Sequence, residues 1–352
     1  MKKKSSSAKY NIKKTLLKNL KDKKILRVFN EFVSSLEEEI IKENKIAIAL
    51  SGGPDSLALV YLGKCLSLIK NYRVKFFIVD HKLRKESSIE ASKIRLILKN
   101  FDINCKVLEW NGKKPKSNIQ SLARKKRYEL LLKACNKEGI SHLLFAHHID
   151  DYTENFFIRL LRGSGLKGLT SFGKIIEDKN SKIKILRPLI RVEKKQLIYI
   201  SKKVFNFYIK DPSNKNEVFQ RTRIRKLTSE LFSEGLDKKK FNLTIDNLKS
   251  SSDVIDFYVN HNISENSKFV ERKNTYILNS KFFDQPKEVI FRSLAYIFVF
   301  ISKNYYPPRG KSIMNLIVNI QLDKFNKSTL GNCCIEKFNQ TYLISKENRS
   351  RR

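Results

Sequence analysis

Five short apolar runs, each followed by a stretch of helical character, occupy the chain between residues 45 and 205. The runs lie at 45–50, 74–80, 105–110, 142–148 and 183–190. The stretches with helical character are 54–70, 87–100, 118–138, 151–162 and 193–204. Nearly continuous apolar strands that alternate with helices are typical of a parallel sheet buried on both faces. We therefore expect an α/β fold, with a parallel sheet and helices on both of its faces.

Regions of different character flank this part of the chain. Residues 1–44 are expected to form a basic arm, frayed up to about residue 24, followed by a helix, with contact to RNA as the alternative role of the arm. The α/β domain is expected over 45–230. Residues 231–352 read as a smaller, mostly helical region with strand-like pieces at its "NTYILNS" and "NQTYLIS" segments.

The charge of the chain is strongly positive. Lys and Arg number 72 against 35 Asp and Glu, which gives a net charge of +37. A composition rich in Lys, Ile and Asn suggests an AT-rich genome, but that bias does not explain why so few acids offset the lysines. A polyanionic partner, most simply a nucleic acid, is the favoured interpretation.

The chain shows no sign of export or of a membrane span. Its basic N-terminal segment lacks the apolar core of a secretory signal. Apolar runs such as 296–301 are too short to span a bilayer. The five cysteines form no CxxC pair, and their odd number suggests reduced thiols. We therefore expect a soluble, cytoplasmic protein with no membrane association.

The hexapeptide "SGGPDS", residues 51–56, lies between the first predicted strand and the first predicted helix. Glycines at such a turn let backbone N–H groups approach a ligand, and the helix N-terminus favours an anion. Pro54 suits the first helical turn. There is no lysine of the Walker A type, and Asp55 would repel a phosphate unless a divalent cation lay between them. The hexapeptide therefore predicts a nucleotide site with Mg²⁺, although an acid at a helix N-terminus is common on its own.

A second set of polar residues lies in "AHHIDDYTEN", residues 146–155. His147 and His148 end a predicted strand, and Asp151 and Glu154 share one face of the next helix. Each residue alone has an ordinary structural explanation. Together, at the sheet edge that also carries the phosphate loop, they suit a metal or an incoming amine. The "GSGLKG" segment, 163–168, matches GxGxxG but follows a helix, so it is not a dinucleotide fingerprint.

Arginines concentrate in three segments of this lysine-rich chain. These segments are 123–128, 159–165 and 221–226. Basic runs are usually solvated faces, but arginine makes planar, bidentate contacts to phosphates.

The motifs together resemble those of the tRNA(Ile)-lysidine synthetases, a family of the PP-loop ATP pyrophosphatase superfamily with its adenine nucleotide alpha-hydrolase-like fold. The resemblance covers about 46–226 and is carried by "SGGPDS", "VDHKLR", "SLARKKRY", "AHHIDDYTENFFIRLLRGSGLKGL", "LRPLI" and "DPSNKNEVFQRTRIR". The first motif marks only the superfamily, whereas the combination is highly specific. Asn216 and Thr222 depart from the usual aspartate and asparagine of the family. They affect fine contacts to RNA more than the reaction.

The resemblance implies a ligase that forms a carbon–nitrogen bond. Such enzymes use ATP and Mg²⁺ to adenylate the oxygen at C2 of cytidine 34 in the isoleucine tRNA with anticodon CAU. The amine of free L-lysine then displaces AMP and forms lysidine, which changes the codon read from AUG to AUA and the tRNA identity from Met to Ile. The C-terminal region, 231–352, would contact the tRNA, and a second C-terminal domain of the longest members would be missing. The oligomeric state stays open, with a homodimer among the options.

The resemblance also implies a set of site residues. The catalytic residues would be Asp55, Asp151, Glu154, His147 and Arg162. ATP would be bound by Ser51, Gly52, Gly53, Pro54, Asp55, Ser56 and Arg187, and the metal by Asp55. The tRNA would be bound by Arg124, Arg127, Arg221, Arg223 and Arg225.

Two other functions compete with this interpretation. A tRNA thiolase of the same superfamily would share the phosphate loop but would need a cysteine pair for sulfur or iron–sulfur chemistry. A basic RNA-binding module without catalysis would not explain the acids at the strand ends.

Overall fold

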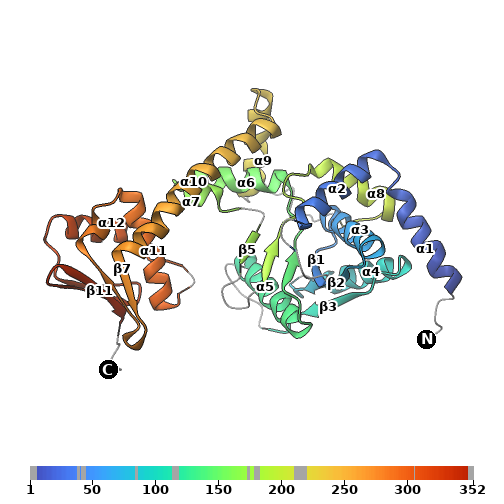
Figure 1. Ribbon diagram of the computed structural model, residues 1–352. Coiled ribbons are helices and arrows are strands. Elements are labelled where there is room, and N and C mark those ends of the chain that lie inside the picture. Colours follow the sequence, from blue (N-terminus) through green and yellow to red (C-terminus); the bar gives the residue numbers. More distant parts are fainter. Residues whose placement is uncertain are drawn as a thin grey trace. The chain divides into compact units, whose positions relative to one another are not determined.

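The computed structural model describes residues 6–37, 40, 45–83, 86–112, 119–172, 175–177, 183–209, 220–304 and 306–347 (Figure 1). The chain divides into two compact units, Met1–Asn242 and Leu243–Arg352. Asn216 and most of the "DPSN" segment lie outside the described residues.

The first unit is built on a six-stranded sheet. Its strands are β1 (Lys45–Leu50), β2 (Arg73–Asp80), β3 (Cys105–Glu109), β4 (His142–Leu144), β5 (Ile175–Glu177) and β6 (Lys184–Leu186). The spatial order is β3-β2-β1-β4-β6-β5. The first five strands of this order pair in parallel, and β5 pairs antiparallel with β6. The parallel sheet expected from the apolar runs is confirmed, and β5 adds an antiparallel edge strand.

Helices connect these strands in the alternation that the sequence predicts. The connecting helices are α3 (Pro54–Ile69), α4 (Ser87–Asn100), α5 (Ile119–Lys137), α6 (Ile149–Leu160) and α7 (Leu166–Thr170). The helices α1 (Ser6–Asn19) and α2 (Lys23–Glu37) precede the first strand, and α8 (Lys194–Phe205), α9 (Gln220–Ser233) and α10 (Lys238–Asn266) follow the last, with α10 extending into the second unit. Among the described residues, no helix is long and apolar enough to cross a membrane.

Side chains of β1 alternate between two apolar layers. Ile46 and Ile48 pack with α1, α2, α3, α4 and α8, whereas Ala47 and Ala49 face a second cluster that includes Leu131 of α5. Figure 1 shows α2 and α3 on one side of the sheet and α5 on the other. Strands buried on both faces explain why β1 reads as a continuous apolar run rather than an alternating one.

The N-terminal segment differs from the frayed arm expected up to about residue 24. Its described part is the helix α1, and Leu16 on this helix is fully buried in the core of the first unit. The Tyr61 hydroxyl of α3 donates a hydrogen bond to the Leu16 carbonyl at 3.1 Å. A few apolar side chains are enough to dock a lysine-rich helix, because the lysines remain in solvent.

The second unit contains an antiparallel sheet in the order β7-β8-β11-β10-β9. Its strands are β7 (Ser267–Val270), β8 (Thr275–Leu278), β9 (Lys327–Leu330), β10 (Cys333–Phe338) and β11 (Thr341–Lys346). The helices α11 (Lys287–Ser302) and α12 (Gly310–Gln321) share an apolar core with the sheet. The two strand-like pieces of the sequence correspond to β8 and β11, and the sheet contains three further strands that the sequence did not mark.

Docking of α1 leads to a prediction about stability. Leu16→Ala should lower the free energy of unfolding of the full chain by about 2–5 kcal/mol, because it leaves a cavity under α1. Lys18→Ala on the same helix, whose side chain is exposed, should change it by less than about 0.5 kcal/mol. Urea unfolding followed by circular dichroism measures both. Equal stability of the two variants would show that α1 is not docked through Leu16.

Candidate active site

The phosphate loop connects β1 to α3 at the carboxyl edge of the sheet. Gly52 has a φ of +83°, and a Cβ there would lie 2.2 Å from Cδ1 of Ile94 and 3.0 Å from Cδ1 of Ile209. This position therefore requires glycine for both conformation and space. Gly53 has an ordinary φ of −70°, and a Cβ there would approach only Ser51 Oγ, at 3.8 Å.

Hydrogen bonds within the protein fix the shape of this loop. The Ser56 hydroxyl donates to the Gly53 carbonyl at 2.9 Å and accepts the Ser51 N–H at 3.2 Å. The Ile209 N–H donates to the Gly52 carbonyl at 2.9 Å. Pro54 occupies the first turn of α3, as the sequence predicts. The loop thus presents the positive end of α3 with a preformed backbone.

Asp55 lies in the first turn of α3 and is half-buried. Its Oδ2 atom lies 3.6 Å from His148 Nε2. Its Oδ1 atom is buried and has no hydrogen-bond partner among the described residues. A buried carboxylate oxygen without a donor is costly, so this atom is suited to a cation brought in with a ligand.

His148 is the centre of the acidic cluster. Its side chain is 2% exposed, and its Nδ1 and Nε2 atoms lie 3.4 Å from Asp150 Oδ2 and 3.5 Å from Asp151 Oδ2. Burial alone would lower the pKa of His148, but the carboxylates of Asp150, Asp55 and Asp151 outweigh it and raise the pKa to about 10. The imidazole is therefore a buried cation that joins the phosphate loop to α6.

Helix α6 begins at Ile149, two residues earlier than the sequence suggested. Its N-cap is His148, whose backbone N–H donates to Asp151 Oδ2 at 3.2 Å. Asp151 thus serves the helix terminus and the imidazole of His148 together, which fixes the direction of its side chain.

Glu154 follows one turn later and is 5% exposed. Burial raises the pKa of its carboxyl group, and Arg225 of α9 opposes that effect. The Arg225 guanidinium donates from Nε to Glu154 Oε1, and from Nη2 to Oε2 at 3.3 Å. The structure therefore pairs a residue predicted to hold lysine with one predicted to hold tRNA.

Asp150 is held by groups that the sequence did not identify. Lys238 Nζ of α10 lies 3.0 Å from Asp150 Oδ1, and the Lys194 N–H donates to Oδ2 at 3.2 Å. Burial would raise the pKa of Asp150, but His148 and Lys238 hold it well below its usual range. Asp150 is therefore a firmly ionised structural partner of His148.

His147 lies on the other side of the strand end, among aromatic rings. Its ring stands 5.7 Å from that of Phe145 and 5.3 Å from that of Phe172. Burial and the neighbouring Arg187 hold the pKa of His147 well below its usual range. The neutral ring accepts a hydrogen bond from Arg187 Nε at Nδ1, at 3.2 Å. Arg187 is 1% exposed and lies over the Phe172 ring at 4.1 Å.

The remaining predicted arginines lie around this cluster. Arg124 is exposed and lies over the Tyr128 ring at 5.4 Å, and Arg127 Nε donates to His81 Nε2 at 3.2 Å. Arg162, beyond the end of α6, is exposed and donates to Gln220 Oε1 at 3.2 Å.

The two arginines at the start of α9 differ from Arg225. Arg221 and Arg223 have exposed side chains, whereas Arg225 is half-buried against Glu154. The first two are therefore open to solvent, whereas the third is turned toward the acidic cluster.

The structure brings the phosphate loop and the acids of α6 together through His148. The sequence grouped His148 with residues suited to a metal or an incoming amine but did not predict it as the link to the phosphate loop, and it gave no indication of Lys238 or Phe172. The histidine next to the two aspartates was a usable signal for the first. No local signal marked the other two, because they reach the site from distant segments.

Comparisons with known proteins agree with this architecture. A family model for the PP-loop domain matches residues 20–231. Among solved structures, the U34-tRNA thiolase NcsA from Methanococcus maripaludis shares the fold, with a TM-score of 0.54 and 19% identity over 64% of this chain and 79% of that one. At that level of identity the likeness concerns the fold alone.

Curated relatives are more similar in sequence. The chain is 33% identical over 311 residues to the tRNA(Ile)-lysidine synthase of Orientia tsutsugamushi, covering 86% of this chain and 70% of that protein. It is 31% identical over 314 residues to the tRNA(Ile)-lysidine synthase of Wolbachia sp. subsp. Brugia malayi, covering 87% of this chain and 72% of that protein. It is 38% identical over 196 residues to the tRNA(Ile)-lysidine synthase of Bradyrhizobium diazoefficiens, covering 55% of this chain and 54% of that protein. On these matches and the motifs of its site, the chain belongs to the tRNA(Ile)-lysidine synthase family, within the PP-loop enzymes.

Proposed function

We propose that this protein uses ATP to join L-lysine to C2 of cytidine 34 in the tRNA(Ile) with anticodon CAU. The oxygen at C2 attacks the α-phosphorus of ATP and pyrophosphate leaves. The lysine amine then attacks C2, the bond from C2 to the adenylated oxygen breaks, and AMP leaves with that oxygen. The observation that carries the proposal is the junction of phosphate loop and acidic cluster at His148.

The loop supplies a site for the leaving pyrophosphate. Residues Ser51 to Ser56 present the N-terminus of α3 in a fixed shape, and Gly53 leaves space for a phosphate to approach the backbone. No lysine is needed, because the γ-phosphoryl group is not transferred on its own.

Mg²⁺ fits one atom of this site. Asp55 Oδ1 has no donor among the described residues, and Mg²⁺ in nucleotide sites commonly uses one or two carboxylates together with the substrate phosphates. Within the described part of the chain, no group of three or more potential ligands is arranged to hold a metal by itself. When bound with ATP, the ion would neutralise charge on the phosphates, and Asp55 would hold it there.

Asp151 and Glu154 are suited to hold the lysine amine. A free lysine ammonium has a pKa near 10.4, so it must lose a proton before it can attack C2. Burial raises the pKa of Glu154, which makes this carboxylate a better proton acceptor than an exposed one. Because Arg225 now neutralises Glu154, the incoming ammonium must share that carboxylate with the guanidinium.

Arg187 and His147 form a hydrogen-bonded pair next to the acidic cluster. Arg187 remains cationic though 1% exposed, and the neutral His147 ring fixes its guanidinium through Nε. We assign Arg187 to the negative charge of the adenylate, with His147 as its support. Arg162, exposed near the start of α9, is the second candidate for this charge.

RNA contact is assigned to the exposed basic groups. Arg124, Arg221 and Arg223 have exposed side chains, and Arg127 lies three residues after Arg124 on α5. The target cytosine must leave its stack, which is least costly in a loop such as an anticodon loop. Location in the cytoplasm and assembly as a homodimer stay predictions from the sequence.

A thiolase reaction is the competing enzyme function. It would need reactive cysteines, yet burial raises the pKa of the Cys65, Cys105 and Cys135 thiols to about 12.

Incubation with tRNA(Ile) transcript, ATP and labelled lysine tests the proposed lysine ligation directly. Label should enter the RNA, and none should enter when ATP is omitted. Sulfur transfer without lysine incorporation would replace the proposal by the thiolase reaction.

Asp55→Asn should lower the rate of tRNA adenylation by about 100-fold or more, because charge stabilisation at the phosphates is lost. Affinity for tRNA and the folded state should be retained. Release of pyrophosphate with tRNA present measures the rate, and thermal unfolding and tRNA binding are the controls. Near-normal pyrophosphate release would reduce Asp55 to an acid that stabilises a helix terminus.

Glu154→Gln should separate the two half-reactions. Adenylated tRNA should still form, whereas transfer should need about 10-fold or more additional lysine, because a charged hydrogen bond to the ammonium is lost. The glutamine oxygen can still accept from Arg225, which limits structural damage. Glu230→Gln, an exposed change on α9, is the matched control. Equal loss of both half-reactions would assign Glu154 a structural role.

Arg221→Ala combined with Arg223→Ala should flatten the salt dependence of tRNA binding. Each phosphate contact contributes a log–log slope of about −0.7 to −0.9, so the slope should change by about 1.4 to 1.8. Titrations between about 50 and 300 mM salt cover Debye lengths of roughly 14 to 6 Å. Arg221→Lys with Arg223→Lys keeps the charge and should keep the slope. An unchanged slope in the alanine variant would place the tRNA contact elsewhere.

A further inference from the structure

The N-terminal part of the chain carries a large excess of positive charge. Its first 30 residues contain ten lysines and one arginine against a single acid, Asp22. That acid is already engaged, because its carboxylate accepts hydrogen bonds from Lys203, from the Tyr199 hydroxyl at 2.7 Å and from the Lys24 N–H at 2.8 Å. The lysines of α1 therefore have no acid of their own segment to neutralise them.

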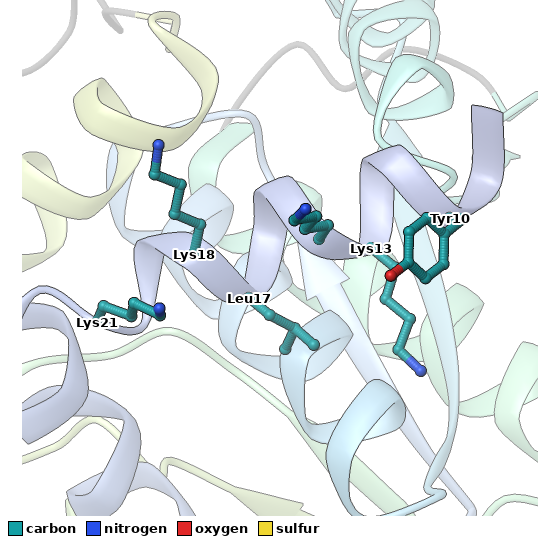
Figure 2. A pocket seen from close by; sticks show the side chains of 6 residues that line it. Tyr10, Lys13, Leu17, Lys18 and Lys21 are labelled. Carbon is teal, nitrogen blue, oxygen red and sulfur yellow. The ribbon is translucent and has the colours of Figure 1, made fainter. Parts of the chain in front are cut away.

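These lysines border an open groove of about 490 Å³ that runs along α1 (Figure 2). Its lining consists of Tyr10, Lys13, Lys14, Leu17, Lys18 and Lys21. The four lysines have exposed side chains, and none forms an ion pair with a described residue. Four unneutralised ammonium groups around one groove make a site for a polyanion.

The spacing of the lysines suits a chain of phosphates. Lys14 and Lys18 are four residues apart and share one face of α1, and Lys21 lines the same groove from the turn that follows the helix. Tyr10 lies at the N-terminal end of the same groove and is 66% exposed. An aromatic face beside ammonium groups can receive a base next to the backbone that the lysines bind.

The rest of α1 holds this surface in place. Leu16 of α1 is fully buried in the core of the first unit, Leu20 in the turn after the helix is 9% exposed, and the Tyr61 hydroxyl donates to the Leu16 carbonyl. A helix that lies in a membrane interface turns its apolar face to the lipid. Here the apolar face is used by the protein core, so RNA fits this surface better than a lipid surface does.

We propose that the groove on α1 binds the phosphodiester backbone of the tRNA, separately from the arginines at the candidate active site. The proposal rests on the proposed function in taking tRNA as the RNA. Tyr61 lies two turns after Pro54 on α3, so α1 meets α3 about 10 Å along that helix from the phosphate loop. The groove would thus hold backbone at some distance from the modified base. Of its six lining residues, five precede residues 20–231, which match the PP-loop family, and Lys21 lies just inside that range.

Paired variants of the full chain test this site. Lys14→Ala with Lys18→Ala should reduce the log–log salt slope of tRNA(Ile) binding by about 1.4 to 1.8, for two lost phosphate contacts. Lys133→Ala with Lys137→Ala removes the same charge at the same spacing from exposed positions of α5 and should leave the slope unchanged. Lys14→Arg with Lys18→Arg should bind as the parent does. An equal change in both alanine variants, or none in either, would overturn the proposal.

Two further measurements distinguish this proposal from the proposed function and from binding to a lipid surface. The binding assay needs no catalysis, so a flattened slope without any lysidine formation would support the groove and contradict the proposed function. Lysidine formation with an unchanged slope would overturn the groove alone. Binding to phosphatidylglycerol–phosphatidylcholine vesicles that is lost in the Lys14, Lys18 alanine variant, with an unchanged tRNA slope, would replace RNA by a lipid surface.

Discussion

Three carboxylates surround the buried imidazole of His148, and they come from two segments that lie far apart in the sequence. Asp55 belongs to the first turn of α3, and Asp150 and Asp151 open α6. Carboxylates cannot gather in a partly buried place without a cation, because their mutual repulsion is weakly screened there. With its pKa raised to about 10, His148 supplies that cation at neutral pH. The phosphate loop and the acids of α6, which we propose bind ATP and the lysine amine, therefore depend on one charged ring.

A second layer of cations holds the acids of α6 from outside. Lys238 of α10 balances Asp150, and Arg225 of α9 balances Glu154. Both helices follow the polar "DPSN" segment in the chain. Helix α9 therefore exposes Arg221 and Arg223 to solvent while its Arg225, together with Lys238 of α10, fixes the acids of α6. Asp55 keeps one oxygen without such a partner among the described residues. The charges of the site are therefore nearly balanced before substrates arrive. The unpartnered Asp55 oxygen is the place where a further cation is favoured, beside the phosphate loop.

Much of the first unit was predictable because its signals are local. The apolar runs of β1 and β2, the glycines before Pro54 and the acids of α6 each act over a few residues. The pairing of Arg225 with Glu154 was not predictable, because it depends on how α6 and α9 pack. Docking of α1 was missed for a related reason, since one buried leucine among many lysines gives a weak periodic signal. The sheet of the second unit was underestimated because its strands are four to six residues long and partly polar.

The two glycines of the phosphate loop, Gly52 and Gly53, are under different structural constraints. At Gly52 the positive φ would strain any other residue, and its Cβ would displace the Ile94 side chain, so the native fold itself favours glycine. At Gly53 the backbone is ordinary and a methyl group would meet no obstacle within the protein. Selection for stability can therefore maintain the first glycine in a chain that has lost its activity, whereas the second would be maintained by the nucleotide that we propose binds there. In a decaying copy of this gene, Gly53 would be free to drift before Gly52.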